Sequence, residues 1–111
     1  MKKQLYFYIT TNTNMTVLYC GVTNSLWHRL IEHYLGNQKT FAGRFRCYNL
    51  NYYEEFDIPM DAIDREKEVK KWSRKKKELL IATMNPDWHF LNLEFFDYWP
   101  PPKEDLHSRG E

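Results

Sequence analysis

One carboxylate stands at an unusual place in the sequence. Glu66 lies three residues after Ile63 and three before Val69, at the margin of an apolar helical stripe. A carboxylate at such a margin is either paired with a cation or faces a cleft. Lys70 follows one helical turn later, so a surface salt bridge would account for Glu66 without any chemistry.

A basic pair could act on an anion. Arg29 and His33 are four residues apart and therefore share one face of a helix. This face could be a solvated surface. Alternatively, the guanidinium binds a phosphate beside an imidazole that titrates near neutral pH.

Two tyrosines could form a third functional pair. If a turn centres on Thr13 and Asn14, Tyr8 lies directly opposite Tyr19 with both side chains on one face. A different turn register would make the two tyrosines diagonal neighbours or break the pairing. Such a pair can simply stabilise a sheet. A phenol, with a pKa near ~10, becomes a base only where positive charge lowers that pKa, and Arg29 or a metal held by Glu66 would supply it.

Residues 65–78 form a strongly basic run. It contains eight Lys and Arg residues against three Glu, and Trp72 interrupts the cations. The run is either a solvated helix face or a footprint for a phosphate backbone.

The elements that must hold these residues can be predicted from pattern. Residues 5–10 and 17–22 are predicted strands of a hairpin, and residues 47–56 a third strand. Asn24 or Ser25 caps a predicted helix from about Leu26 to Leu35, with Gly36 as its left-handed stop. Residues 37–46 read as a loop that carries Arg44.

The second half of the chain is predicted to be helical at first. Asp61 is expected to cap a helical region that reaches about Met84, with an interruption at Ser73, and residues 85–87 end it. Four apolar residues are expected to pack back on the core: Trp88, Phe90, Leu91 and Leu93. The pattern predicts an α+β domain over residues 1–93 and an acidic, proline-containing tail over 94–111, partly disordered.

Composition excludes several classes of protein. The 111 residues are 42% hydrophobic and 17% aromatic, which excludes a disordered chain, and the net charge is only +1. The sequence contains no stretch of about 18 apolar residues, the length that a helix needs to span a bilayer. Cys20 and Cys47 lack the spacing for zinc or a disulfide framework, so we expect a cytoplasmic protein with two reduced thiols.

Together these residues resemble the GIY-YIG nuclease superfamily, in its small single-domain branch similar to the nuclease domain of the excision-repair incision subunit. Tyr6-Phe7-Tyr8 and Tyr19-Cys20-Gly21 stand at the two name-giving motifs. Arg29 follows Tyr19 by ten residues and His33 four later. Further matching segments are Tyr52-Tyr53-Glu54, Arg65-Glu66-Lys67, Lys70-Lys71-Trp72 and Asn85-Pro86-Asp87-Trp88.

The resemblance implies a three-stranded antiparallel sheet flanked by helices in the order ββαβαα. It also implies hydrolysis of DNA phosphodiesters that depends on a divalent metal, Mg2+ or Mn2+. Glu66 would bind the metal and Arg29 the scissile phosphate. Tyr8 would be the general base, with Tyr19 and His33 orienting or sharing the proton, and Asn85 would support the site.

The predicted DNA contacts are basic residues of the loop and the helical run: Arg44, Lys70, Lys71, Arg74 and Lys75. The first motif lacks its glycine and isoleucine, and Cys20 replaces the isoleucine of the second, where strand alternation points it away from Tyr19. The alternatives are a non-catalytic nucleic-acid-binding module using residues 65–77 and a protein-interaction adaptor. The sequence leaves open the DNA form, the pathway, whether repair or another, the oligomeric state, and a protein partner that supplies specificity.

Overall fold

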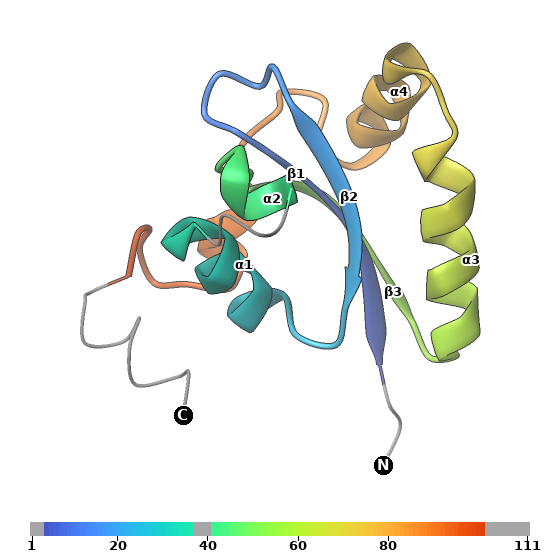
Figure 1. The fold of residues 1–111 in the computed structure, drawn as a ribbon, viewed down its shortest axis with the longest axis horizontal. Coiled ribbons are helices and arrows are strands. Elements are labelled where there is room, and N and C mark those ends of the chain that lie inside the picture. The colour runs from blue at the N-terminus through green and yellow to red at the C-terminus, as the bar shows by residue number, and fades with distance from the viewer. Residues whose placement is uncertain (1–3, 37–40, 102–111) are drawn as a thin grey trace.

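The computed structural model describes residues 4–36 and 41–101. Three strands, β1 (Leu5–Thr11), β2 (Leu18–Thr23) and β3 (Asn49–Phe56), form an antiparallel sheet in the order β2-β1-β3. The helix α1 (Leu26–Leu35) lies on one face of this sheet, and α3 (Pro59–Lys70) and α4 (Arg74–Met84) lie on the other (Figure 1). The predicted α+β class and the order ββαβαα are confirmed.

The register of the hairpin differs from the predicted one by two residues. Tyr8 pairs with Gly21, and Tyr19 pairs with Thr10. Tyr8 and Tyr19 still share a face, but they are diagonal neighbours with ring centroids 6.1 Å apart. The prediction of a tight turn was wrong because residues 12–17 form a longer loop in which Met15 adopts a left-handed conformation, φ 58°.

Both predicted ends of α1 are confirmed. The hydroxyl of Ser25 accepts a hydrogen bond from the His28 amide, which satisfies a backbone donor at the start of the helix. Gly36 adopts the left-handed conformation at the other end, with φ 76°, and its amide donates to the carbonyl of His33.

Two predicted boundaries were wrong. Residues 41–44, expected in a loop, form a short helix, α2 (Phe41–Arg44), whose Ala42 is buried and accepts from the Cys47 amide at 2.8 Å. The helix α3 begins at Pro59 rather than after Asp61, because proline suits the first helical turn where its missing amide costs no hydrogen bond. The predicted break at Ser73 is confirmed, since its hydroxyl accepts from the Lys76 amide and starts α4, and the predicted stop at Asn85 is confirmed as well.

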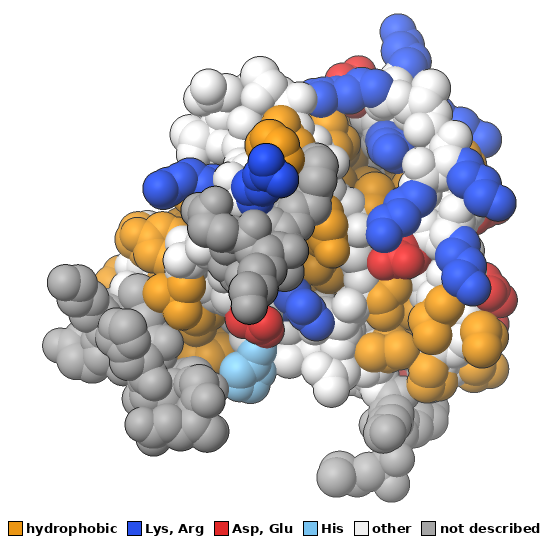
Figure 2. Space-filling view, viewed as in Figure 1, with side chains coloured by type: hydrophobic (Ala, Val, Ile, Leu, Met, Phe, Trp, Pro, Cys, Tyr) orange, Lys and Arg blue, Asp and Glu red, His pale blue; other side chains and the backbone are white. Residues whose placement is uncertain are grey.

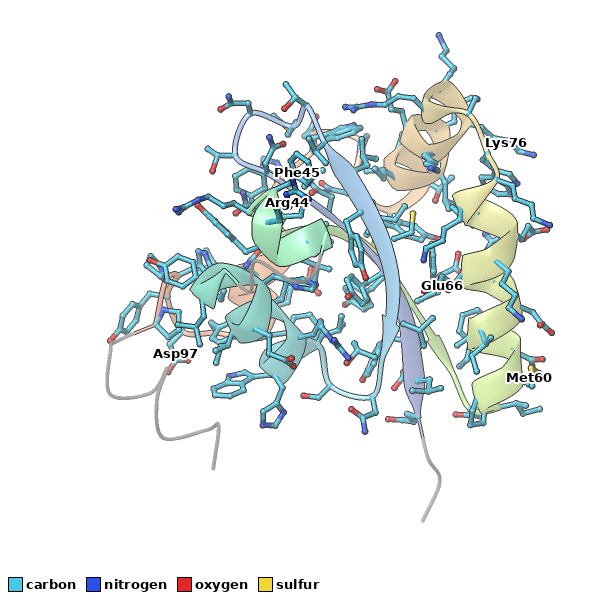
Figure 3. The ribbon with its side chains drawn as sticks, in the orientation of Figure 1. Arg44, Phe45, Met60, Glu66, Lys76 and Asp97 are labelled. Atoms are coloured by element: carbon cyan, nitrogen blue, oxygen red, sulfur yellow. The ribbon has the colours of Figure 1, made fainter. Side chains whose placement is uncertain are left out.

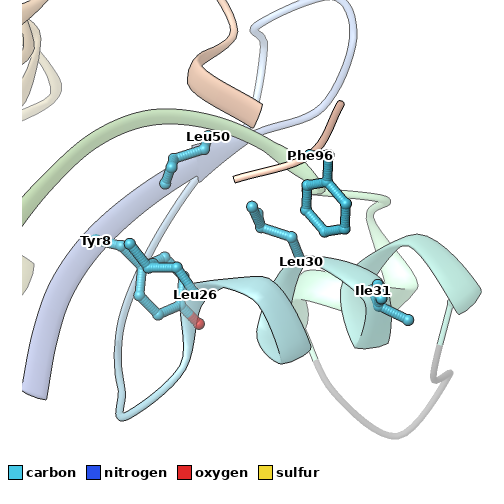
Figure 4. Close-up of a cluster of buried hydrophobic side chains, with 6 residues drawn as sticks. All are labelled: Tyr8, Leu26, Leu30, Ile31, Leu50 and Phe96. Carbon is cyan, nitrogen blue, oxygen red and sulfur yellow. The ribbon is translucent and has the colours of Figure 1, made fainter. Parts of the chain in front are cut away.

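The sheet divides the core in two. The α1 face carries the cluster drawn in Figure 4, formed by Tyr8, Leu26, Leu30, Ile31, Leu50 and Phe96. The opposite face buries Phe7, Ile9, Cys20, Tyr52, Val69 and Ile81 under α3 and α4. Cys20 therefore packs away from Tyr19, as predicted, and both cysteines are free thiols.

The segment after α4 returns to the core only in part. Trp88 and Leu91 pack on the two clusters as predicted, but Phe90 is 38% and Leu93 64% exposed, so the prediction was wrong for these two. Phe95, Phe96 and Trp99 also contact the α1-side cluster, although they follow the boundary predicted at residue 93.

A short 3-10 helix, η1 (Leu91–Glu94), lies within this returning segment. Of the tail predicted over residues 94–111 as partly disordered, residues 102–111 lie outside the described residues. No helix in the described part of the chain has the length and apolar character needed to cross a membrane.

Candidate active site

Tyr8 occupies the middle of the candidate site. It lies on the central strand β1, is 1% exposed, and projects toward α1 because residues alternate between the two faces. Burial raises the pKa of its phenol well above the ordinary value; Tyr19 adds to the shift and the smaller effect of Arg29 opposes it. Tyr8 is therefore a protonated phenol in this structure.

His33 of α1 is the hydrogen-bond partner of Tyr8. The phenol oxygen of Tyr8 and Nε2 of His33 are 3.0 Å apart, and both residues are buried. Burial, and secondarily the charge of Arg29, lowers the pKa of His33 to about 4. With the phenol protonated and the imidazole neutral, the hydrogen bond can take two forms. Either the Tyr8 hydroxyl donates to Nε2 and the imidazole proton is on Nδ1, or Nε2–H donates to the phenol oxygen, and only the first form lets His33 accept the proton of Tyr8.

Tyr19 completes a group of three rings. Its ring lies 5.5 Å from that of His33 in an edge-on arrangement and 6.1 Å from that of Tyr8. Tyr19 is half-buried on the edge strand β2, whereas Tyr8 and His33 are buried. Of the two predicted tyrosines, Tyr19 is thus the one that solvent or a ligand reaches more readily.

Arg29 precedes His33 by one turn of α1. Its side chain is 38% exposed, and its nearest ion-pair partner is Glu32 at 4.0 Å. The Nε atom of Arg29 is buried without a hydrogen-bond partner. A buried guanidinium donor that lacks a partner costs free energy, and an anion held beside it would satisfy that donor.

Glu66 approaches the site from the other side of β2. It projects from α3 toward the sheet (Figure 3), and its carboxylate lies 3.6 Å from Nζ of Lys70. The predicted salt bridge is therefore present. Burial raises the pKa of both Tyr8 and Cys20, and Glu66 adds the smallest part of each shift, so its charge acts on one group on each face of the sheet.

Asn85 is used differently from the other predicted site residues. Its amide nitrogen donates to the carbonyls of Asn51 at 3.1 Å and His89 at 2.7 Å, and its oxygen accepts from the His89 amide at 2.9 Å. These bonds fix the turn after α4 against β3. The prediction that Asn85 supports the site stays a prediction.

The predicted DNA contacts separate into two groups. Arg44, Lys70, Lys71 and Lys75 are exposed. Lys and Arg side chains gather along the side of the molecule formed by α3 and α4 (Figure 2), with the exposed ones at Lys67, Lys70, Lys71, Arg74, Lys75 and Lys76. Arg74, however, donates to the backbone carbonyls of Met15 and Thr16 and pairs with Glu78.

Arg65 of the same run is also committed to the fold. Its guanidinium makes two hydrogen bonds to Glu54 of β3, at 2.9 and 3.0 Å, and one to Glu68 at 2.7 Å. From the sequence, Arg65 is one charge of the basic run and part of the matching segment Arg65-Glu66-Lys67, with no partner indicated. Trp72 packs on the core between two cations. Cζ of Arg65 lies 5.3 Å and Nζ of Lys76 lies 4.1 Å from the centroid of its ring.

Gly21, the last residue of the Tyr19-Cys20-Gly21 motif, also belongs to the candidate site, although the motif alone indicates no role for it. It lies opposite Tyr8 on β2, where the phenol ring crosses the strand. A glycine within a strand pattern signals the close approach of another group, and that signal could have identified it.

Any metal at this site would have few protein ligands. Within residues 4–36 and 41–101, no group of three or more His, Cys, Asp or Glu residues could hold a metal ion. Mg2+ commonly binds one or two carboxylates and keeps several waters and substrate phosphate oxygens. A single half-buried carboxylate such as Glu66 fits that ligand set and does not fit a structural zinc site.

The α+β domain carries a guanidinium on α1, a carboxylate on α3 and two phenols on β1 and β2, and the family model that matches it is of the nuclease type. The chain belongs to the GIY-YIG family, because the GIY-YIG catalytic domain matches residues 4–79. The resemblance stated from the sequence is thereby confirmed.

Known relatives are small proteins of similar length. The chain is 36% identical over 83 residues to a UPF0213 protein of Bacillus pumilus, covering 75% of this chain and 84% of the relative. It is 35% identical over 77 residues to a UPF0213 protein of Natronomonas pharaonis, covering 69% and 89%. The solution NMR structure of the UPF0213 protein BH0048 from Bacillus halodurans is similar with a TM-score of 0.50 and 27% identity, covering 81% of this chain and 95% of that one.

Proposed function

We propose that the protein is an endonuclease that hydrolyses DNA phosphodiester bonds with the help of a divalent metal ion. The observation that carries the proposal is the unpartnered Nε of Arg29, beside the hydrogen-bonded pair of Tyr8 and His33. An anion-binding donor next to a chain of groups that can exchange protons is what hydrolysis of a phosphodiester requires.

Each residue has a role that its surroundings favour. Arg29 binds a non-bridging oxygen of the scissile phosphate and stabilises the charge that develops on it. Glu66 would hold the metal, Mg2+ or Mn2+, which when bound would supply further charge neutralisation at the phosphate.

The general base must work without becoming a buried anion. Burial opposes a Tyr8 phenolate, and the neutral imidazole of His33 lies within hydrogen-bond distance. In our proposal the oxygen of Tyr8 accepts a proton from the attacking water while the Tyr8 hydroxyl passes its own proton to Nε2 of His33. Tyr8 then remains neutral throughout, and Tyr19 orients the water.

Exposed lysines on α3 and α4 support binding of the substrate. Lys70 lies beside Glu66, and Lys71 and Lys75 continue the basic surface past the end of α3. Ammonium groups in such a row bind successive phosphates without reading bases. The same surface favours the second candidate, a nucleic-acid-binding module without catalysis.

One experiment separates the two candidates. The purified protein is incubated with single-stranded, duplex and branched DNA, with Mg2+, with Mn2+ and with chelator. The Glu66→Gln variant is compared with Glu68→Gln, which lies on the same helix and pairs with Arg65. We expect metal-dependent cleavage that Glu66→Gln abolishes and Glu68→Gln retains. Binding of every substrate without cleavage would favour the second candidate.

A further inference from the structure

The loop between β1 and β2 is held by specific hydrogen bonds. The side-chain oxygen of Asn12 accepts from the amides of Thr16 at 2.9 Å and Val17 at 3.0 Å. Its amide nitrogen donates to the Thr16 hydroxyl at 2.7 Å, and Met15 takes a left-handed conformation. The loop conformation is therefore defined up to the residue before β2.

Arg74, the first residue of α4, binds this loop through hydrogen bonds to its backbone. Arg74 donates to the carbonyl of Thr16 at 2.7 Å through one terminal nitrogen and to that of Met15 at 2.5 Å through the other. Its Nε donates to Glu78 at 3.0 Å, which orients the guanidinium. Three of the five N–H donors of this guanidinium are thus engaged within the protein, one from each nitrogen.

The loop decides a question that the strand pattern leaves open. A slip by one residue would exchange the faces of β2, but a slip by two leaves every side chain on its own face. Two registers therefore satisfy the same hydrophobic pattern. A tight turn at Thr13 and Asn14 would place Tyr19 opposite Tyr8, whereas the observed loop places Gly21 opposite Tyr8 and Tyr19 opposite Thr10.

We propose that Arg74 is a positioning residue, which fixes the register of the hairpin and thereby sets Tyr19 diagonal to Tyr8 and edge-on to His33, rather than directly opposite Tyr8. This inference rests on the proposed function only for the part Tyr19 plays in cleavage. It reassigns Arg74 from the predicted DNA contacts, and it connects the basic start of α4 to the catalytic rings on the opposite face of the sheet.

The test compares Arg74→Lys with Lys75→Gln, its exposed neighbour in the first turn of α4. Lysine keeps the charge but cannot form the planar fork that reaches two carbonyls and a carboxylate. Three quantities are measured: amide hydrogen exchange of residues 15–19, DNA affinity, and the single-turnover cleavage rate at saturating DNA.

We expect Arg74→Lys to speed exchange of these amides at least ten-fold and to lower the single-turnover rate about ten-fold, with DNA affinity within two-fold of wild type. Lys75→Gln should instead weaken DNA binding several-fold and leave the exchange rates unchanged. Arg74→Lys with weakened DNA binding and unchanged exchange would overturn the inference and make Arg74 a DNA contact.

The exchange measurement needs no cleavage. If the wild-type protein cut no DNA, the proposed function would fail while the exchange result still decided whether Arg74 fixes the loop. If Arg74→Lys did not fold, Glu78→Ala, which removes the acceptor that orients the guanidinium, would be measured in its place. Unchanged exchange in Glu78→Ala would then count against the inference.

Discussion

The ring of Tyr8 crosses the neighbouring strand at Gly21, in a space that no other residue would leave free. A Cβ built on Gly21 would lie 2.5 Å from the phenol oxygen of Tyr8 and 2.6 Å from the ring carbon that carries it. It would also lie 2.9 Å from a ring carbon of Tyr19. Gly21 of the second motif thus leaves the space in which the Tyr8 ring of the first motif reaches His33.

Gly21→Ala should disrupt both the fold and the site. Tyr8 is buried and cannot swing away, so the added methyl group must displace the ring or the strand, at a cost of about 2–3 kcal/mol in the free energy of unfolding. Denaturant unfolding measures the loss. The double variant with Tyr8→Ala should lose clearly less than the sum of the two single losses, because alanine removes the clash. Additive losses would show that the methyl group clashes with something else.

His33 should give the protein a pH-dependent stability. The pKa of His33 is lowered to about 4 in the fold, so between the ordinary value of 6.5 and about 4 the unfolded chain binds a proton that the folded chain does not. This contribution to stability is complete above about pH 6.5, is lost progressively as the pH falls from 6.5 to about 4, and changes little below that, for a total of on the order of 3 kcal/mol. Denaturant unfolding at several pH values should show this slope, and His33→Gln should lack it. Equal slopes in both proteins would contradict the buried neutral imidazole.

Arg29 should act on the imidazole as well as on the phosphate. Its charge is the second cause of the lowered pKa of His33, after burial, so Arg29→Gln should move that pKa upward without restoring the ordinary value. Cleavage should fall at least 100-fold, because a donor to the developing oxyanion is lost. NMR titration of the His33 ring measures the first effect, and Arg46→Gln, an exposed arginine, is the control that should leave the pKa unchanged. If the pKa of His33 did not change in Arg29→Gln, the guanidinium of Arg29 would not lie close enough to act on the imidazole.

The parts of the fold that local rules determine could be predicted from sequence. Ser25 and Gly36 mark the ends of α1 because a hydroxyl cap and a left-handed glycine act on neighbouring residues. The hairpin register could not be predicted, since its two candidates share one hydrophobic pattern and differ only in the loop that Arg74 holds. The helix α2 is four residues long, too short for a periodic signal.

The candidate site was predictable for a related reason. Tyr8, Tyr19, Arg29 and His33 lie on regular elements, so strand alternation and helical spacing bring them to one side of the sheet. The use of an arginine depends instead on partners distant in sequence. Arg65 of α3 donates hydrogen bonds to Glu54 of β3. Arg74 donates to the carbonyl of Thr16, in the loop between β1 and β2, 58 residues earlier in the chain. Counting charges could not distinguish these two arginines from the exposed lysines around them.

That distinction gives a prediction for DNA binding. The double variant Lys71→Gln with Lys75→Gln should make the dependence of log affinity on log salt concentration less steep. The magnitude of the slope should fall by about 1–2, since each lost phosphate contact removes roughly 0.9 from it. Arg65→Gln should leave this slope unchanged, because the guanidinium is bound to Glu54 and Glu68 rather than free for phosphate. It should instead lower the free energy of unfolding by about 1–3 kcal/mol, as Glu54 loses two charged hydrogen bonds. Affinities over a range of salt concentrations, with denaturant unfolding of the same proteins, check both parts. A slope that falls equally in Arg65→Gln would mean that total charge, and not the exposed lysines, binds the DNA.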